Sequence, residues 1–316
     1  MKNIYPQIQH FLENIAQEST APIYSLRPAQ ARDVLKNLQE ISVVKQPAHI
    51  QDLAIPFGAS DSLALRIYRP EGNNGTIPVV VWMHGGGWVL GGNQTHDRLM
   101  REISNEANAA VVFVDYTLAP EAQYPVIHEQ CYAAAIWVAN HGKDYNLDTS
   151  KIAIAGDSVG GQLATAVAMM AKERGDVQFI YQLLFYPVTS ASLDTRSYQE
   201  FATGYWLERK SMEWFWDQYV PDKNVRKNPL VSPLQASFEE LKGMPAAGII
   251  VGENDVLRDE GEAYAHKLMQ AGVSTVAVRY LGLIHDFALL NALSQVSGVR
   301  AAIAQGSQLL HSALYF

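Results

Sequence analysis

The sequence is poor in cysteine, because Cys131 is the single one among 316 residues. One cysteine excludes an internal disulfide and most cysteine-rich metal sites, and it fits a reducing compartment. We expect Cys131 to be a small buried side chain in a helix over residues 126–138, since cysteine packs as an apolar residue.

Long hydrophobic runs are also missing. Nowhere do about 18 uncharged apolar residues follow one another, and the first residues contain no apolar core followed by a small-residue cleavage site. We therefore predict a cytoplasmic protein that does not insert into a membrane.

Basic clusters and metal motifs are absent as well. The chain has 24 Lys and Arg against 32 Asp and Glu, a formal net charge of −8. This balance argues against a nucleic-acid partner, which requires a basic surface to meet phosphates. No His-Glu-x-x-His occurs, and no Gly-x-Gly-x-x-Gly opens a helix after the first parallel strand. We expect no metal and no organic cofactor.

The chain does contain a regular alternation of strand-like and helix-like segments. Two segments, 52–56 and 63–68, predict an antiparallel pair joined by a turn at 58–62. Short apolar runs separated by helix-length segments follow, and they predict a mostly parallel sheet of eight strands in all, with helices on both faces. These runs are residues 79–82, 110–114, 152–155, 181–185, 247–251 and 275–280.

The domain organisation follows from two segments outside this alternation. Residues 1–45 contain two amphipathic helical stretches, and residues 188–235 form an insertion rich in aromatics that we interpret as a helical cap. Residues 46–187 and 236–316 then form the two parts of one α/β core. We expect the aromatics to serve partly as cap core and partly as lining of an apolar substrate pocket, the candidates for lining being Trp88, Tyr205, Trp206 and Trp214.

Ser158 lies in the motif Gly156-Asp157-Ser158-Val159-Gly160, between a predicted strand and a predicted helix. A serine at such a corner needs a strained backbone, and its neighbours two residues away must lack a Cβ. A tight turn without catalytic meaning is the structural alternative. The context favours an activated nucleophile.

Such a nucleophile requires an acid and then a histidine later in the chain, in loops at the carboxyl ends of strands. Among the nine histidines, only His285 lies at the carboxyl edge of the final predicted strand. Three carboxylates, Glu253, Asp255 and Asp259, follow the strand before it. Asp259 falls in the first turn of the next helix, where a carboxylate has a sufficient structural role. We predict that Asp255, ahead of Glu253, orients His285 toward Ser158.

A glycine run, His84-Gly85-Gly86-Gly87-Trp88, follows the third predicted strand. Consecutive glycines allow backbone N–H groups to turn toward one point, and together with the N–H of Val159 they are expected to form an oxyanion hole. His84 is expected to anchor this loop through a hydrogen bond, and Asp157 to support neighbouring loops.

With these motifs the chain resembles the bacterial esterases of the hormone-sensitive-lipase family, which have the α/β-hydrolase fold. Further matching motifs lie at residues 115–121, 185–187, 255–261 and 284–287. The resemblance covers nearly the whole length. It implies a triad of Ser158, Asp255 and His285, oxyanion N–H groups from Gly86, Gly87 and Val159, and amino-terminal helices that join the cap.

Two residues depart from the family pattern. Val159 stands where alanine is common, and its branched side chain is expected to narrow the pocket while keeping its N–H. Asp286 stands where glycine is common after the histidine. It either places a second carboxylate near His285 or points to solvent, and we favour solvent.

The predicted activity is hydrolysis of carboxylic esters through a serine acyl-enzyme, with a small-molecule ester as substrate. The resemblance implies acyl chains of short to medium length and a homodimer formed through the eighth strand. Lactone or amide hydrolysis by the same triad is one alternative. A catalytically silent small-molecule binding protein of the same fold is the other.

Overall fold

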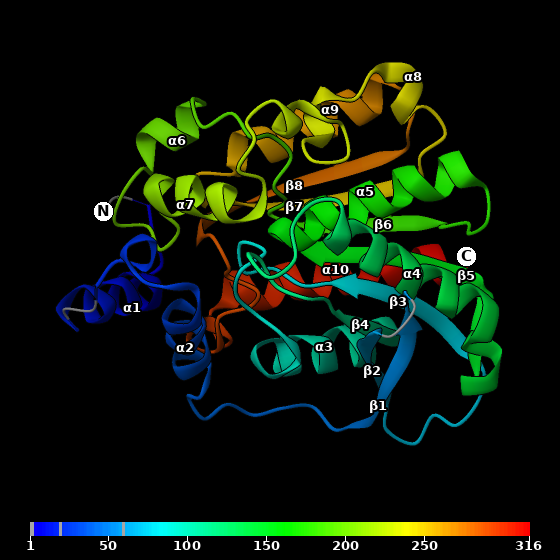
Figure 1. The fold of residues 1–316 in the computed structure, drawn as a ribbon. Helices are drawn as coiled ribbons and strands as arrows, with labels where there is room; N and C mark the ends of the chain where they lie inside the picture. Colours follow the sequence, from blue (N-terminus) through cyan, green and yellow to red (C-terminus); the bar gives the residue numbers. More distant parts are fainter. Residues whose placement is uncertain (1–2, 19–20, 59–60) are drawn as a thin grey trace.

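The computed structural model describes residues 3–18, 21–58 and 61–316. One sheet of eight strands runs through the molecule in the order β1-β2-β4-β3-β5-β6-β7-β8 (Figure 1). β1 and β2 form an antiparallel pair, β2 is antiparallel to β4, and all other neighbours are parallel. The strands are β1 (Ala48–Phe57), β2 (Asp61–Pro70), β3 (Ile77–Met83), β4 (Ala110–Asp115), β5 (Leu147–Asp157), β6 (Tyr181–Phe185), β7 (Ala246–Asn254) and β8 (Thr275–Ile284).

This sheet confirms the predicted fold class, and the antiparallel pair at its start confirms the first two predicted strands. The turn expected at 58–62 includes residues 59 and 60, which lie outside the described residues. Sequence periodicity placed the start of β5 at residue 152, whereas the strand begins at Leu147. Residues 148–151 of this strand are polar and half-buried or exposed, so a search for apolar runs does not detect them.

Helices cover both faces of the sheet, as predicted. α3 (Asn93–Ala107) and α10 (Ser297–Tyr315) pack on one face, and α4 (Val126–His141), α5 (Val159–Arg174) and α9 (Arg258–Gln270) pack on the other. Each face of the sheet has its own core cluster. Alternate side chains of β3 point to opposite faces, so Val79 and Val81 belong to one cluster and Val80 and Trp82 to the other. Burial on both faces explains why the central strands are continuous apolar runs.

Of the remaining helices, α1, α2, α6 and α7 lie together at one side of the molecule, at the left of Figure 1, whereas α8 lies on the opposite side, just before β7. The amino-terminal group is α1 (Pro6–Gln17), η1 (Ile23–Ser25) and α2 (Pro28–Gln39). The segment between β6 and β7 holds α6 (Arg196–Glu200), α7 (Arg209–Tyr219), η3 (Val225–Lys227), η4 (Pro233–Gln235) and α8 (Phe238–Leu241). Two short 3₁₀ turns complete the chain, η2 (Gly142–Tyr145) and η5 (Asn291–Leu293). The proposed division into core and cap remains a prediction.

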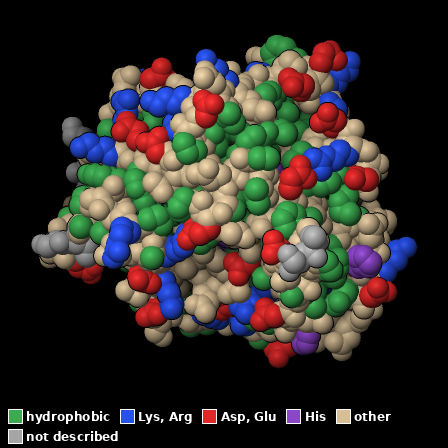
Figure 2. Space-filling view, in the orientation of Figure 1, with side chains coloured by type: hydrophobic (Ala, Val, Ile, Leu, Met, Phe, Trp, Pro, Cys, Tyr) green, Lys and Arg blue, Asp and Glu red, His purple; other side chains and the backbone are tan. Residues whose placement is uncertain are grey.

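The surface is mixed in character. On the face shown in Figure 2, acidic and basic side chains are interspersed among apolar and uncharged ones. Among the helices of the described chain, none combines the length and apolarity needed to cross a membrane. Cys131 is buried in α4, as predicted.

Candidate active site

Ser158 occupies the sharp corner between β5 and α5. Its backbone has φ +56° and ψ −122°, a conformation that L-residues rarely adopt. A Cβ on Gly156 would lie 2.3 Å from the carbonyl oxygen of Gly160, and one on Gly160 would lie 2.0 Å from that of Met83. Both glycines are therefore required by close backbone approach, which is the physical basis of the motif.

Three side chains from separate loops meet at this corner. His285 Nε2 lies 2.9 Å from Ser158 Oγ, and His285 Nδ1 lies 2.7 Å from Asp255 Oδ2. Asp255 follows β7 and His285 follows β8, so neighbouring parallel strands deliver them to one edge of the sheet. All three residues are buried. The geometry matches a nucleophile, a base and an orienting acid.

The competing carboxylates have other partners. Glu253 accepts a hydrogen bond from the Gly282 N–H at 2.8 Å, and Asp259 accepts one from the Ser197 N–H at 2.7 Å. Asp259 lies in the first turn of α9, as expected. Asp255 also accepts from the Leu257 N–H at 2.9 Å, so its second oxygen holds the carboxylate in place.

The electrostatics of His285 reflect two opposing effects. Burial by itself lowers the pKa of His285, but the negative charges of Asp255 and Asp286 outweigh it and raise the pKa to about 9. A carboxylate on Nδ1 also fixes the tautomer of the neutral ring, with Nε2 free to accept the serine proton.

The glycine loop after β3 has its predicted location beside Ser158. Gly86 and Gly87 have φ of +111° and +62°, and the loop is closed by a hydrogen bond from the Leu90 N–H to the Gly86 carbonyl at 2.8 Å. A Cβ on Gly87 would lie 2.2 Å from the Phe215 ring. Val159 is the first residue of α5, so its N–H lies at the positive end of a helix dipole.

His84 and Gly85 connect this loop to the core. The His84 ring is stacked on Tyr116 at 4.1 Å and Phe113 at 5.2 Å, and its Nδ1 lies 2.8 Å from the Gly85 carbonyl oxygen. Burial lowers the pKa of His84 to about 3, so the ring is neutral and donates to that carbonyl. His84 thus lies under the loop rather than beside the substrate.

Asp157 is buried directly behind the loop. It accepts hydrogen bonds from Trp82 Nε1 at 3.0 Å and from His96 Nε2 at 3.2 Å. A Cβ on Gly85 would lie 2.4 Å from its Oδ2, so the carboxylate and the loop backbone are in direct contact. The contact of His96 with Asp157 is not predictable from the sequence, because the position of His96 on an amphipathic helix gives no sign of it.

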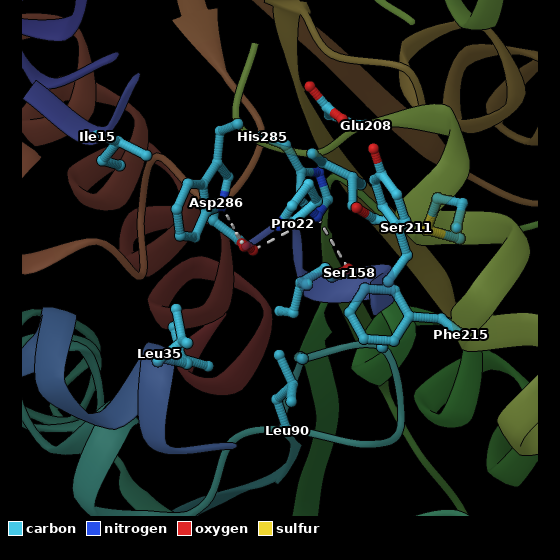
Figure 3. Close-up of a pocket in the computed structure, with 18 of the residues that line it drawn as sticks. Ile15, Pro22, Leu35, Leu90, Ser158, Glu208, Ser211, Phe215, His285 and Asp286 are labelled. Carbon is cyan, nitrogen blue, oxygen red and sulfur yellow. Dashed lines mark hydrogen bonds and ion pairs between the residues drawn. The ribbon is translucent and has the colours of Figure 1, made fainter. Parts of the chain in front are cut away.

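A cavity of about 320 Å³ opens above Ser158 and His285 (Figure 3). Its walls are mainly apolar and come from α1, η1, α2, the glycine loop and α7. The apolar lining includes Leu12, Ile15, Pro22, Ile23, Val34, Leu35, Leu90, Leu207, Met212 and Phe215. Sequence reasoning had not assigned these side chains to the pocket, because apolar residues on an amphipathic helix equally predict core.

Of the four aromatics predicted to line the pocket, only Trp206 does so. Trp88 is fully buried, stacks on Tyr219 at 4.1 Å and donates to Gln162 at 3.2 Å. Trp88 has a φ of +61°, and its ring packs against Trp216 and Tyr219 of α7 instead of lining the cavity. Tyr205 packs on Phe201 instead, and Trp214 is half-buried against Phe215, with ring centroids 5.2 Å apart, outside the cavity lining.

The expectation that Asp286 points to solvent is wrong. Its φ of +58° turns the side chain into the cavity, where Oδ1 lies 3.4 Å from His285 Nε2 and Oδ2 accepts a hydrogen bond from Trp206 Nε1 at 2.9 Å. Burial raises the pKa of Asp286, although the charge on His285 and the Trp206 hydrogen bond oppose that effect. Figure 3 shows its carboxylate between His285 and the Leu35 side of the cavity.

Within the described chain, no group of three or more His, Cys, Asp and Glu side chains is placed to hold a metal ion. A serine on a strand-to-helix corner, a histidine after the last strand and an acid after the one before define the class of an α/β-hydrolase.

Comparisons with known proteins agree. A family model described as the α/β-hydrolase fold matches residues 80–289, and a carboxylesterase family model matches residues 22–121. The chain belongs to the α/β-hydrolase family, and its resemblance to the hormone-sensitive-lipase type of esterase is confirmed.

Individual relatives span most of the chain. It is 41% identical to the carboxylic ester hydrolase LipN of Mycobacterium tuberculosis, over 84% of this chain and 69% of that one. It is 31% identical to an ethyl acetate hydrolase of Pseudomonas putida, over 92% and 94%. A solved esterase from Pseudomonas putida ECU1011 superposes with a TM-score of 0.98 at 44% identity, over 100% of this chain and 99% of that one.

Proposed function

We propose that this protein hydrolyses carboxylic esters through an acyl-enzyme formed on Ser158. The observation that carries the proposal is the hydrogen-bonded chain from Ser158 Oγ through His285 to Asp255. Neutral His285 accepts the serine proton as Oγ attacks the ester carbonyl, and Asp255 stabilises the imidazolium that forms.

The tetrahedral intermediate carries its negative charge on the former carbonyl oxygen. The N–H groups of Gly86, Gly87 and Val159 are assigned to that oxygen, because the glycine loop and the start of α5 both border Ser158. His285 then protonates the leaving alcohol, and the acyl group remains on Ser158. Water activated by the same histidine releases the acid.

The substrates are proposed to be esters with short to medium acyl chains. An apolar cavity of about 320 Å³, bordered by the amino-terminal helices and α7, supports this size range. A relative named ethyl acetate hydrolase supports it as well. A series of nitrophenyl esters should show a maximum of kcat/KM at short or medium chains. A rate that climbs steadily with chain length, or jumps at an oil–water interface, would contradict the assignment.

The direct test of the nucleophile is Ser158→Ala. Its kcat on a nitrophenyl ester should fall by roughly 10⁶, the scale of loss for a triad nucleophile, while substrate binding is retained. Ser307→Ala is a matched control, because Ser307 is equally buried and its hydroxyl has no hydrogen-bond partner in the described chain. Near-normal turnover by the Ser158 variant would overturn the proposal.

We also propose a cytoplasmic location and a homodimer formed through β8. β8 is an edge strand of the sheet, and it exposes Val276 and Leu281 to solvent. An unpaired edge with apolar side chains favours pairing with a second copy. Light scattering should give twice the chain mass of 35.0 kDa, and a monomer at micromolar concentration would contradict the dimer.

A further inference from the structure

The charged groups that line the cavity are unbalanced. Besides His285, they are two carboxylates, Glu208 and Asp286. No lysine or arginine lines the cavity within the part of the chain that the structure describes. Lys210 contacts the ring of Tyr24 at the rim, but its side chain is exposed and lies outside the lining. Because the reaction requires His285 in its neutral form, a reacting substrate in this cavity meets two carboxylates and no lysine or arginine.

Asp286 holds its charge at a fixed point. Trp206 Nε1 binds Oδ2 at 2.9 Å, whereas Oδ1 makes no hydrogen bond and lies 3.4 Å from His285 Nε2. The side chain is only partly exposed, and burial strengthens the interaction between a carboxylate and an opposite charge. One carboxylate oxygen thus faces the cavity without a hydrogen-bonded partner.

The location of Asp286 beside His285 Nε2 indicates which part of a bound ester lies nearest to the Asp286 carboxylate. His285 must deliver its proton to the alcohol oxygen, so that oxygen lies next to Nε2 when the ester bond breaks. Asp286 Oδ1 lies beside the same nitrogen. The alcohol portion of the ester, rather than the acyl portion, is therefore the part nearest the carboxylate.

We propose that the enzyme prefers esters whose alcohol portion carries a positive charge, such as esters of amino alcohols, and that Asp286 determines this preference. The preference rests on the proposed ester hydrolysis. Aromatic rings support it, because Trp206 and Phe215 line the same cavity and ring faces attract ammonium groups. Glu208 is a second carboxylate in the lining, farther from Ser158 than Asp286 is (Figure 3), and it accepts a hydrogen bond from the Gly204 N–H at 3.1 Å.

Acetylcholine and 3,3-dimethylbutyl acetate form a suitable probe pair, since they share one shape and differ in the charge of a single quaternary centre. Wild-type protein should show a higher kcat/KM for the cationic ester. Asp286→Asn should reduce the cationic-to-neutral ratio about tenfold, equivalent to about 1.4 kcal/mol. Asparagine tolerates a positive φ and can still accept from Trp206, so the fold is preserved.

The ratio isolates the charge effect, because both esters depend on the same His285 and any change in its pKa cancels. Glu208→Gln should lower the ratio by a smaller factor. Glu213→Gln is the matched control, since Glu213 is an exposed carboxylate on α7 that does not line the cavity, and it should leave the ratio unchanged.

An unchanged ratio in Asp286→Asn, or a wild-type ratio at or below one, would overturn the preference while leaving ester hydrolysis intact. Failure of the wild-type protein to hydrolyse the neutral ester would instead overturn the proposed function.

Discussion

Replacing Asp157 by Asn should weaken both the fold and the reaction, because this buried carboxylate lies behind the nucleophile and the glycine loop. It accepts hydrogen bonds from Trp82 and His96 and touches the backbone of Gly85. Burial raises the pKa of Asp157, but the His96 charge and these hydrogen bonds outweigh it and hold the pKa below its usual value. The group is thus an anion in the folded protein.

The magnitude follows from the two hydrogen bonds. Asparagine keeps one acceptor oxygen, and the bond to that oxygen changes from a charged one of about 1.5–3 kcal/mol to a neutral one of about 0.5–1.5 kcal/mol, a loss of about 1 kcal/mol. The amide nitrogen cannot accept from the other donor, so the second bond is lost, which costs about 2 kcal/mol. The free energy of unfolding should therefore fall by about 3 kcal/mol, which for a chain of 316 residues lowers Tm by about 4–5 °C. Because the loop positions the proposed oxyanion donors, kcat should fall about tenfold at unchanged KM.

Thermal unfolding and steady-state hydrolysis of a nitrophenyl ester measure the two effects. Asp97→Asn is the matched control, since Asp97 is also largely buried on the same helix as His96 but pairs with Lys45 and Arg101 away from the site. It should lower Tm slightly and leave kcat unchanged. Wild-type Tm and kcat in Asp157→Asn would show that the carboxylate does not support the loop.

Three further outcomes are expected. Gly87→Ala should lower kcat by about 10²–10³, since the new Cβ collides with Phe215 and displaces a proposed oxyanion donor; wild-type kcat would remove Gly87 from that role. Asp255→Asn should lower kcat by roughly 10⁴ because His285 then loses its orienting carboxylate, and a loss below tenfold would favour another acid. The pH profile of kcat/KM should rise until pH passes the His285 pKa of about 9, since only the neutral ring accepts a proton. Asp286→Asn removes a negative charge that raises this pKa, so its acidic limb should move to lower pH; an unmoved limb would contradict the electrostatic reasoning.

The sheet and the grouping of Ser158, Asp255 and His285 could both be predicted from the sequence, because both follow from the order of strands and helices along the chain. Continuous apolar runs mark doubly covered strands, and the carboxyl ends of parallel strands meet at one edge. Two glycines that cannot accept a Cβ mark the corner at Ser158. Such features are local or topological, and they do not require knowledge of side-chain packing.

The direction of side chains around the cavity could not be predicted in the same way. Asp286 has a positive φ and lies against His285, and Trp88 has a positive φ and packs against α7. Leu35 lines the cavity although its apolar pattern on α2 equally fits a core residue. These side-chain directions depend on packing between segments far apart in the chain, and the periodicity of the sequence does not indicate that packing.

The most direct measurement of the central claim is titration with a nitrophenyl phosphonate followed by mass spectrometry. The geometry around Ser158 predicts one nitrophenol released per chain, one phosphonyl adduct on Ser158 and loss of activity in proportion to labelling. Labelling of a different residue, or full activity after Ser158 is modified, would contradict the assignment of Ser158 as the nucleophile.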